Sequence, residues 1–222
     1  MRLTKQINAY NVDCMDFMKD KPDNYYDLAI VDPPYGIGIS QQSQGKGGGV
    51  ALKIDYAVKN WDSAVPTREY FIEVMRSSVN QIIWGGNYFG LRPTPCFIVW
   101  DKLNGATDFA DCELAWTSFN TAVRKFEWRW AGMLQQNMST KEERMHPTQK
   151  PVALYRWLLT NYAKEGDKIL DTHGGSFSSA IACHKEGFDL DICELDTDYF
   201  NDAVNRFKLN TCQKELEFAR PD

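Results

Sequence analysis

Short apolar runs alternate with segments of helical spacing along this chain, and this alternation limits the possible folds more than any other feature. Runs such as residues 28–31 and 168–171 stop at prolines or before a glycine turn, which is typical of buried strands. We expect strands at 8–12, 28–31, 81–86, 97–100, 113–116, 168–171 and 190–194. Because helices separate most of these strands, the pattern predicts an α/β fold with a mostly parallel sheet and helices on both faces.

The composition is that of one globular domain. The chain has 222 residues, of which 43% are hydrophobic, enough for the hydrophobic core of a single catalytic domain over residues 1–222. No apolar run is long enough to cross a membrane, and residues 1–6 lack the apolar segment of a signal peptide. The six cysteines have no paired spacing, which favours reduced side chains in a cytoplasmic protein. The three histidines show no metal-ligand spacing, so we expect no metal site.

The motif Asp32-Pro33-Pro34-Tyr35 directly follows the apolar run at 28–31. Open α/β sheets bind ligands at the carboxyl ends of their strands, so we expect this motif at such an edge. Proline has no N–H, which leaves the Pro33 carbonyl available as an acceptor beside the Asp32 carboxylate. These two acceptors suit the two protons of an exocyclic amino group, and Tyr35 can lie against the ring that carries it. The alternative is that the proline pair only ends a strand.

A second motif, Asp171-Thr172-His173-Gly174-Gly175-Ser176, combines a strand end, a glycine turn and a helix start. Glycine lets a ligand approach the backbone closely. Glu194 ends the next expected strand, where a carboxylate can accept hydrogen bonds from both hydroxyls of a ribose. Together these residues predict an adenosine-binding βαβ unit, although an α/β unit without a cofactor can carry similar glycines. A dinucleotide site is disfavoured because Phe177 and Ser179 stand where that pattern needs glycine.

Between the two motifs lies His146-Pro147-Thr148-Gln149-Lys150-Pro151, which leads into a helix expected at 151–166. A helix N-terminus carries partial positive charge and unpaired N–H groups, and Lys150 adds a full charge. We therefore expect this segment to hold the carboxylate of an amino-acid-like ligand. An ordinary helix start explains Thr148 and Pro151 equally well, but it does not explain a lysine where an acid is favoured.

Taken together, the three motifs and Glu194 resemble those of the S-adenosylmethionine-dependent amino-methyltransferases of DNA. The order, with the catalytic motif before the cofactor motif, resembles their β-class permutation, and the small size is similar to solitary enzymes of phages and mobile elements. The resemblance runs from Asp13 to about residue 207 and implies a permuted Rossmann-like methyltransferase fold with a seven-stranded sheet. The family commonly has Asp-Pro-Phe-x-Gly-x-Gly in its cofactor turn. Here Thr172, His173 and Phe177 differ, which bears on the tightness of cofactor binding.

The resemblance also implies a reaction and its residues. A methyl group would pass from S-adenosylmethionine to the exocyclic amine of an adenine flipped out of the duplex. Adenine is favoured over cytosine because cytosine enzymes more often carry serine in place of Asp32. The implied catalytic residues are Asp32, Pro33, Pro34 and Tyr35, with Tyr35 stacked on the base. The implied cofactor-binding residues are Asp13, His146, Thr148, Lys150, Asp171, Gly174, Gly175, Ser176 and Glu194; Asp13 is equally well explained as a turn or helix-cap acid.

Two stretches could contact nucleic acid despite the net charge of −5. Residues 37–60 contain a glycine-rich loop that we expect to be mobile and to close over the substrate. Residues 117–146 form a small target-recognition insertion, too short for a separate domain, which predicts a short or relaxed recognition sequence. The expected DNA contacts are Lys46, Lys53, Lys59, Arg124, Lys125, Arg129, Lys141 and Arg144.

The expected partner is double-stranded DNA; a homodimer, the recognition sequence and a cognate restriction endonuclease are left open. Three alternatives remain. One is methyl transfer to cytosine N4 or to a protein glutamine, and another is a nucleic-acid-binding partner without catalysis. The intact motif at 32–35 argues against that silent partner, whereas the altered turn at 172–177 argues for it. An NAD enzyme is the least favoured.

Overall fold

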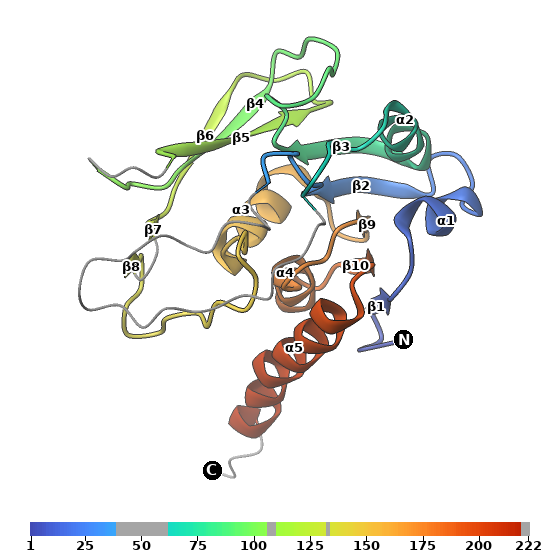
Figure 1. The fold of residues 1–222 in the computed structure, drawn as a ribbon. Coiled ribbons are helices and arrows are strands. Elements are labelled where there is room, and N and C mark those ends of the chain that lie inside the picture. The colour runs from blue at the N-terminus through green and yellow to red at the C-terminus, as the bar shows by residue number, and fades with distance from the viewer. Residues whose placement is uncertain (39–61, 106–109, 132–133, 219–222) are drawn as a thin grey trace.

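The computed structural model describes residues 1–38, 62–105, 110–131 and 134–218. Within these ranges eight strands form one sheet in the order β1-β10-β9-β2-β3-β5-β4-β6 (Figure 1). The neighbours β1, β10, β9, β2 and β3 are parallel, and β5 runs antiparallel to both β3 and β4. The strands are β1 (Ile7–Tyr10), β2 (Tyr26–Val31), β3 (Ser78–Trp84), β4 (Phe97–Asp101), β5 (Cys112–Thr117), β6 (Arg124–Glu127), β9 (Lys168–Asp171) and β10 (Asp189–Cys193).

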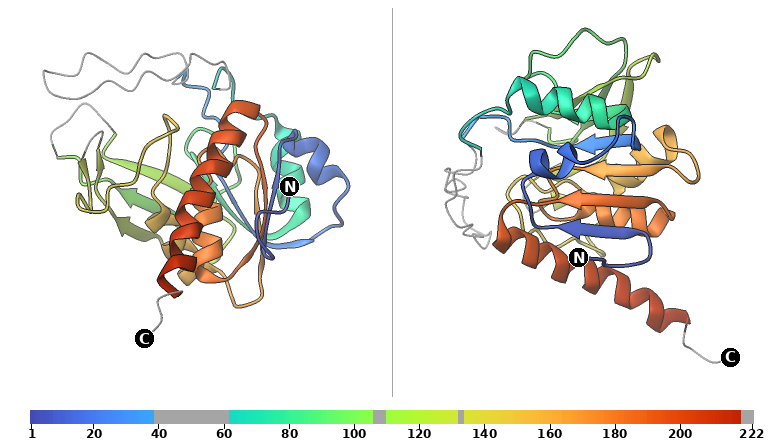
Figure 2. Two further views of the ribbon diagram at one scale, coloured as in Figure 1. Left: turned by 90° about the horizontal axis from the view of Figure 1, so that it is seen from below. Right: turned by 90° about the vertical axis from the view of Figure 1, so that its right-hand side faces the viewer.

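Helices cover both faces of this sheet, as the left view of Figure 2 shows. On one face lie α1 (Cys14–Lys19) and α2 (Arg68–Ser77); on the other lie α3 (Val152–Tyr162), α4 (Ser178–Glu186) and α5 (Thr197–Phe218). Successive strand residues point to opposite faces, so Ile30 packs in the core with α3 to α5 and Val31 in the core with α1 and α2. The sheet is therefore buried on both sides, as parallel sheets require.

The predicted fold class is confirmed, and the described sheet has one strand more than the predicted seven. The additional strand is β6, which lies at the sheet edge and pairs parallel with β4. Its sequence, Arg-Lys-Phe-Glu, lacks an apolar run, so hydrophobic patterning gives no signal for it. α4 begins at Ser178 instead of residue 174, because residues 174–177 form a turn in which Phe177 adopts a left-handed conformation with φ of 57°.

One edge of the sheet collects residues of the motifs at 32–35 and 171–176 together with Glu194. β2, β9 and β10 run in the same direction and end at this edge, where Asp32, Thr172 and Glu194 follow them. β5 runs the other way, so Glu113 near its start reaches the same edge. Lys102, directly after β4, arrives there as well. This is the edge at which open α/β sheets bind their ligands.

The insertion predicted at 117–146 contains β6 and a separate antiparallel pair, β7 (Trp130–Ala131) with β8 (Leu134–Gln135). The indole N–H of Trp130 donates to the carbonyl of Gln149 at 2.9 Å, which ties the insertion to the segment before α3. The loop predicted at 37–60 lies outside the described residues except for its first two positions, and so do Lys46, Lys53 and Lys59.

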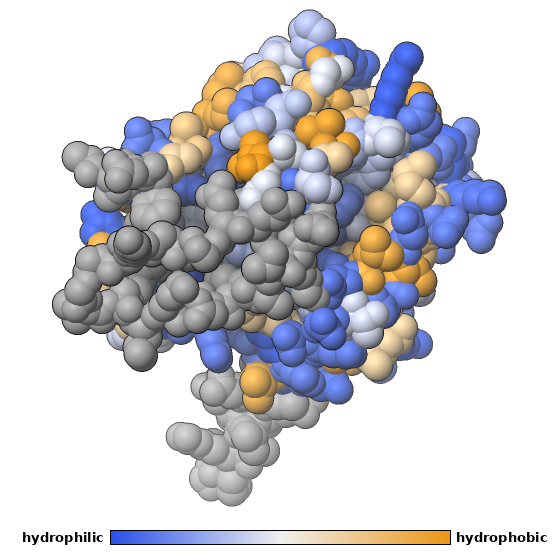
Figure 3. Space-filling view, in the orientation of Figure 1, coloured by the Kyte–Doolittle hydropathy of each residue, from blue (hydrophilic) through white to orange (hydrophobic). Residues whose placement is uncertain are grey.

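The face of the molecule shown in Figure 3 carries many polar side chains. On the face shown in Figure 3, hydrophobic side chains form small separate groups among hydrophilic ones. Among the described residues, no helix has the length and apolar character needed to cross a lipid bilayer.

Candidate active site

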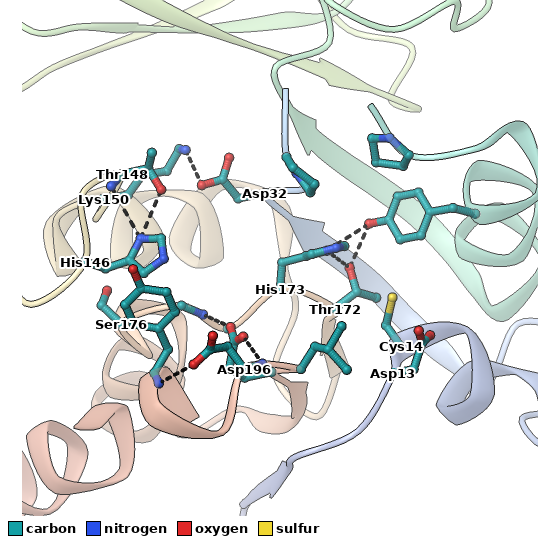
Figure 4. A pocket seen from close by; sticks show the side chains of 18 of the residues that line it. Asp13, Cys14, Asp32, His146, Thr148, Lys150, Thr172, His173, Ser176 and Asp196 are labelled. Carbon is teal, nitrogen blue, oxygen red and sulfur yellow. Dashed lines mark hydrogen bonds and ion pairs between the residues drawn. The ribbon is translucent and has the colours of Figure 1, made fainter. Parts of the chain in front are cut away.

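Two adjoining cavities lie at the edge where the motif residues meet. The first, of about 620 Å³, is lined by the ends of β9 and β10, the start of α1 and the segment before α3 (Figure 4). The second, of about 420 Å³, is lined by the 32–35 motif and by residues next to β3, β4 and β5. The residues that line both are Asp32, Pro34, Thr148, Gln149 and Lys150. Ligands in the two cavities would therefore meet beside Asp32.

Glu194 faces the first cavity with its carboxylate fixed by two backbone amides. One oxygen accepts the N–H of Gly175 at 2.8 Å, and the other accepts the N–H of Asp196 at 2.8 Å. Each carboxylate oxygen has a second acceptor position, so two ligand hydroxyls can still be bound. Leu195, the next residue, is 66% exposed and lines the same cavity. A carboxylate beside an exposed apolar side chain fits a ligand that combines a ribose with a flat ring.

The glycine turn is shaped by Phe177, which stands where the family commonly has glycine. Phe177 is fully buried, and its ring packs edge-on against Phe200 with centroids 5.8 Å apart. A Cβ on Gly174 would lie 2.6 Å from the Phe177 ring, so glycine is needed there to admit this ring. Gly175 has a φ of +50°, and a Cβ there would lie 3.8 Å from the His146 ring. Both glycines line the first cavity, so the altered turn still presents its backbone to a ligand.

Asp171 supports the turn from behind and is not among the lining residues of either cavity. Its carboxylate accepts from the Ser179 hydroxyl at 2.5 Å and from the His173 N–H at 3.1 Å. Burial raises the pKa of Asp171 to about 7. His173 packs edge-on against Tyr70, and burial lowers the pKa of its imidazole to about 4. Asp171 thus stabilises the turn, and it does not line the cavity in which a ligand contact was expected.

His146 and Thr148 lie across the first cavity from Asp13, as Figure 4 shows. The His146 Nδ1 atom is 3.1 Å from the Thr148 hydroxyl, and the ring packs against Tyr199 with centroids 4.5 Å apart. Asp13 lines the cavity and also caps α1, where it accepts the Met15 N–H at 2.7 Å. The helix-cap interpretation of Asp13 is therefore correct, and it does not exclude a ligand contact.

Ser176 lines the first cavity at the end of the turn. It is buried, and its hydroxyl lies 3.2 Å from that of Ser178. Its carbonyl accepts from the Arg206 guanidinium at 2.6 Å.

Lys150 is buried among other charges where the two cavities meet. Its side chain is 3% exposed, and its ammonium pairs with the Asp32 carboxylate and lies 3.1 Å from Oε2 of Glu113. Lys102 pairs with Oε1 of Glu113 at 2.5 Å. Two acids and two lysines therefore form one charge-balanced cluster. A ligand carboxylate was the partner predicted for Lys150, whereas in the structure Lys150 pairs with two carboxylates of its own chain.

The N-terminus of α3 also has a partner within the chain. One oxygen of Glu142 accepts the Val152 N–H at 3.1 Å, and the other pairs with Arg206 at 2.7 Å. A carboxylate at this position is favoured by the positive end of the helix dipole. The ligand carboxylate expected at this helix terminus is thus replaced by Glu142.

The charges around Asp32 influence one another. Burial raises the pKa of Asp32; Lys150 lowers it, and Glu113 raises it further. Burial also opposes ionisation of Glu113, but the two lysines outweigh it and hold the pKa of Glu113 at about 2. For Lys150, burial disfavours the charged form, yet the two acids raise its pKa above the ordinary value. The lysine therefore stays charged beside Asp32.

Tyr35 is held from several sides. Its hydroxyl donates to Oδ1 of Asp32 at 2.7 Å, and its ring stacks on Tyr88 with centroids 5.1 Å apart. Gly85 has a φ of +73°, and a Cβ there would lie 2.3 Å from the Tyr35 ring. The stacked partner in this structure is thus Tyr88, which is 47% exposed and lines the second cavity. The two rings offer an aromatic surface at the cavity that a planar base requires.

The basic residues of the 117–146 segment are divided between the cavity and the outer surface. Arg144 lines the second cavity, with its guanidinium 5.3 Å from the Trp130 ring centroid. Lys125 pairs with Glu127 and lies 3.5 Å from Asp101, which reduces its charge available for a ligand. Arg124, Arg129 and Lys141 are exposed.

Four residues that line the cavities were not among the predicted site residues: Lys102, Glu113, Tyr88 and Tyr199. Lys102 lies two positions after the apolar run at 97–100, so a signal like that of Asp32 could have found it. Glu113 precedes its apolar run, and its position becomes informative only when β5 is known to be antiparallel.

Solved structures of three proteins share this fold. M1.HpyAVI, solved as a complex with SAM, is 18% identical with a TM-score of 0.55, and the match covers 90% of this chain and 98% of that one. PvuII DNA methyltransferase, which is cytosine-N4-specific, is 13% identical with a TM-score of 0.58, covering 92% and 87%. TTHA0409, a putative DNA modification methylase from Thermus thermophilus, is 16% identical with a TM-score of 0.53, covering 92% and 95%. At these identities the likeness shows the fold alone.

The sequence also matches a family of N6 and N4 methyltransferases, described as DNA methylase, over residues 94–205. This range is half of the chain and includes the segment before α3, the glycine turn and Glu194. The resemblance to DNA amino-methyltransferases is confirmed at this level. The chain belongs to the N6/N4 DNA methylase family.

Proposed function

We propose that this protein transfers a methyl group from S-adenosylmethionine to the N6 amino group of an adenine flipped out of double-stranded DNA. The observation that carries the proposal is the position of Asp32 on the wall shared by the two cavities. A methyl donor in the first cavity and a base in the second would face each other beside this carboxylate. Such fixed placement of two reactants supplies a large part of an enzyme's rate enhancement.

The residues of the first cavity fit S-adenosylmethionine. Glu194 would accept the ribose hydroxyls, and Leu195 and Val12 would pack on the adenine ring. His146 and Thr148 lie nearer the shared wall, where the amino-acid end of the ligand would reach. When bound, the donor supplies a methyl group already activated by the positive charge on sulfur, so the protein's task lies with the acceptor amine.

The residues of the second cavity fit that task. An exocyclic amine shares its lone pair with the ring and is a poor nucleophile. Acceptors at Asp32 and the Pro33 carbonyl would bind its two protons and stabilise the positive charge that develops on nitrogen. The new C–N bond forms as the S–C bond breaks, with its electron pair left on sulfur. The nitrogen then has one proton too many, and the Asp32 carboxylate is placed to accept it.

The aromatic surface made by Tyr35 and Tyr88 would hold the flipped base. Flipping costs a few kcal/mol because stacking and pairing are lost. Stacking on an aromatic side chain returns about 1–3 kcal/mol per base. Arg124, Arg129 and Lys141 are exposed on the segment that carries β6 to β8, where they would contact phosphates. We assign target recognition to this segment and expect a short or relaxed site.

The choice of adenine over cytosine rests on the acid at position 32 and on family resemblance.

The free thiols of the five described cysteines agree with an enzyme acting in a reducing cytoplasm.

The test is a methylation assay on unmethylated plasmid DNA, followed by nucleoside digestion and mass spectrometry. We expect N6-methyldeoxyadenosine from the protein and none from Asp32→Ala. Calorimetry on Asp32→Ala should show retained binding of S-adenosylmethionine, which separates loss of chemistry from loss of folding. Detection of N4-methyldeoxycytidine in place of N6-methyldeoxyadenosine would identify cytosine as the target base. A wild-type protein that binds neither S-adenosylmethionine nor DNA would refute the proposal.

A further inference from the structure

We infer that Lys150 is a positioning residue that keeps the partly buried Asp32 ionised and aimed at the base, and that Glu113 and Lys102 complete the charge balance of this cluster. The inference rests on the proposed function, because it concerns the acid that the proposal places beside the amine. It gives Lys150 a role toward Asp32 in place of a role toward the methyl donor.

The geometry of the Lys150 ammonium supports this role. A lysine ammonium has three N–H donors. Those of Lys150 have three acceptors within reach: Asp32 Oδ2, Glu113 Oε2 at 3.1 Å and the Tyr35 hydroxyl at 3.2 Å. All three acceptors belong to the chain, so no N–H remains for the carboxylate of a bound ligand.

The Asp32 carboxylate is oriented by the same contacts. Oδ2 pairs with Lys150, and Oδ1 accepts the Tyr35 hydroxyl at 2.7 Å. Lys150 thus contacts both Asp32 and the residue that donates to its second oxygen. The carboxylate is held at two points, and each oxygen keeps an acceptor position for the amine.

The charge balance explains why Glu113 and Lys102 accompany this pair. The Asp32 side chain is 15% exposed and lies close to a second acid, Glu113. A buried acid next to another acid tends to take up a proton, and a protonated Asp32 would lose much of its acceptor strength. Lys150 lies between the two acids and opposes this protonation. Lys102 pairs with the outer oxygen of Glu113 and so balances the remaining negative charge.

The other titratable groups that face Asp32 do not replace Lys150. Tyr70 on α2 and Tyr155 on α3 are buried, and burial raises the pKa of each well above its ordinary value, so both stay neutral. Asp171 adds negative charge when it is ionised and would raise the pKa of Asp32. Glu113 acts in the same direction, and the Tyr35 hydroxyl is neutral. Among the described groups with an interaction at Asp32, Lys150 alone brings a positive charge to it.

The experiment measures the pKa of Asp32 directly in protein carrying ¹³C-labelled aspartate carboxyls, with Asp32→Asn used to assign the signal. Lys150→Met should raise the pKa of Asp32 by about 1–3 units, the range typical for loss of an adjacent opposite charge. Glu113→Gln should lower it, because an acid is removed and Lys150 is left to Asp32. Lys102→Met is the matched control: it removes a lysine of the same cluster that does not contact Asp32, so its shift should be smaller than that of Lys150→Met.

Two further readouts complete the test. In single-turnover methylation, the rising limb of the pH–rate profile should move to higher pH in Lys150→Met by the same amount as the Asp32 pKa. Calorimetry should show that this variant keeps the wild-type affinity for S-adenosylmethionine. A fall in affinity of about tenfold or more with an unchanged Asp32 pKa would overturn the inference in favour of a ligand-carboxylate role.

The NMR arm does not depend on catalysis, so it decides the inference even if the proposed reaction fails. An Asp32 pKa that is the same in folded Lys150→Met and wild type would overturn it. If Lys150→Met does not fold, Lys150→Gln, which removes the charge but keeps N–H donors, takes its place: a raised Asp32 pKa supports the inference, and an unchanged or lowered one refutes it.

Discussion

Gly85→Ala is predicted to destabilise the protein and to disable the site through one contact, that of residue 85 with the Tyr35 ring. The new methyl group would lie 2.3 Å from that ring, well inside contact distance. It would also place alanine at a φ of +73°, which costs about 1–2 kcal/mol for a residue with a Cβ. Overpacking adds about 1–3 kcal/mol. The sum, about 2–5 kcal/mol, corresponds to a fall in Tm of about 4–20 °C for a domain of this size.

Gly166→Ala provides the matched control. Gly166 has a φ of +87°, and nothing lies within 4 Å of its ideal Cβ, so only the backbone strain of about 1–2 kcal/mol applies. The two variants and wild type are compared by calorimetric melting and by the methylation assay. We expect Gly166→Ala to keep its activity, because residue 166 lines neither cavity. In Gly85→Ala, displacement of the Tyr35 hydroxyl from Asp32 should lower the rate about 100-fold, as for a reacting group misplaced by 1 Å.

A double-mutant cycle isolates the contact itself. In a Tyr35→Ala background the ring is absent, so Gly85→Ala should cost only the strain that Gly166→Ala reports. If Gly85→Ala costs no more than Gly166→Ala, and costs the same with and without Tyr35, then the tight packing of Gly85 on Tyr35 is not what fixes the Tyr35 ring.

Three more predictions test other parts of the structure. Burial lowers the pKa of His173 from 6.5 to about 4, so the neutral imidazole contributes its full stability above pH 6.5, and this contribution of about 3 kcal/mol is lost as the pH falls through 4. In urea unfolding between pH 7 and 4.5, the free energy of unfolding should therefore fall less steeply with decreasing pH for His173→Asn than for wild type. Glu194→Ala should weaken binding of S-adenosylmethionine about tenfold or more in calorimetry, and an unchanged affinity would remove Glu194 from the donor site. Arg206→Met leaves Glu142 without its ion-pair partner and should lower the free energy of unfolding by about 3 kcal/mol, whereas Arg156→Met, which breaks an exposed pair with Glu186, should cost less than about 1 kcal/mol.

The strand-end acids could be predicted because their signal is local. Asp32 and Glu194 follow apolar runs, and parallel strands carry such residues to one edge of the sheet. The turn at 172–177 was also visible as glycines after a strand. These features depend on a few adjacent residues, so one sequence is sufficient to find them.

The partners of Lys150 could not be predicted because they are distant in the chain. Asp32 is 118 positions away, and Glu113 reaches the site only because β5 is reversed. A lysine before a helix gives no sign that it will be buried between two acids. The helix terminus expected to bind a ligand is occupied by Glu142, which a simple count of unpaired N–H groups does not anticipate. Contacts between residues far apart in the sequence therefore determine both the partners of Lys150 and the partner of the α3 N-terminus.

The reversed direction of β5 brings a separate part of the chain to the second cavity. The ends of β9 and β10 line the first cavity, whereas residues at the ends of β4 and β5 and Trp130 line part of the second. Substitutions between residues 100 and 130 can therefore remodel this part of the second cavity without altering β9 and β10 beside the first. Under the proposed function, the wall around the base could diversify within this one stretch, while the strands beside the methyl donor were inherited unaltered.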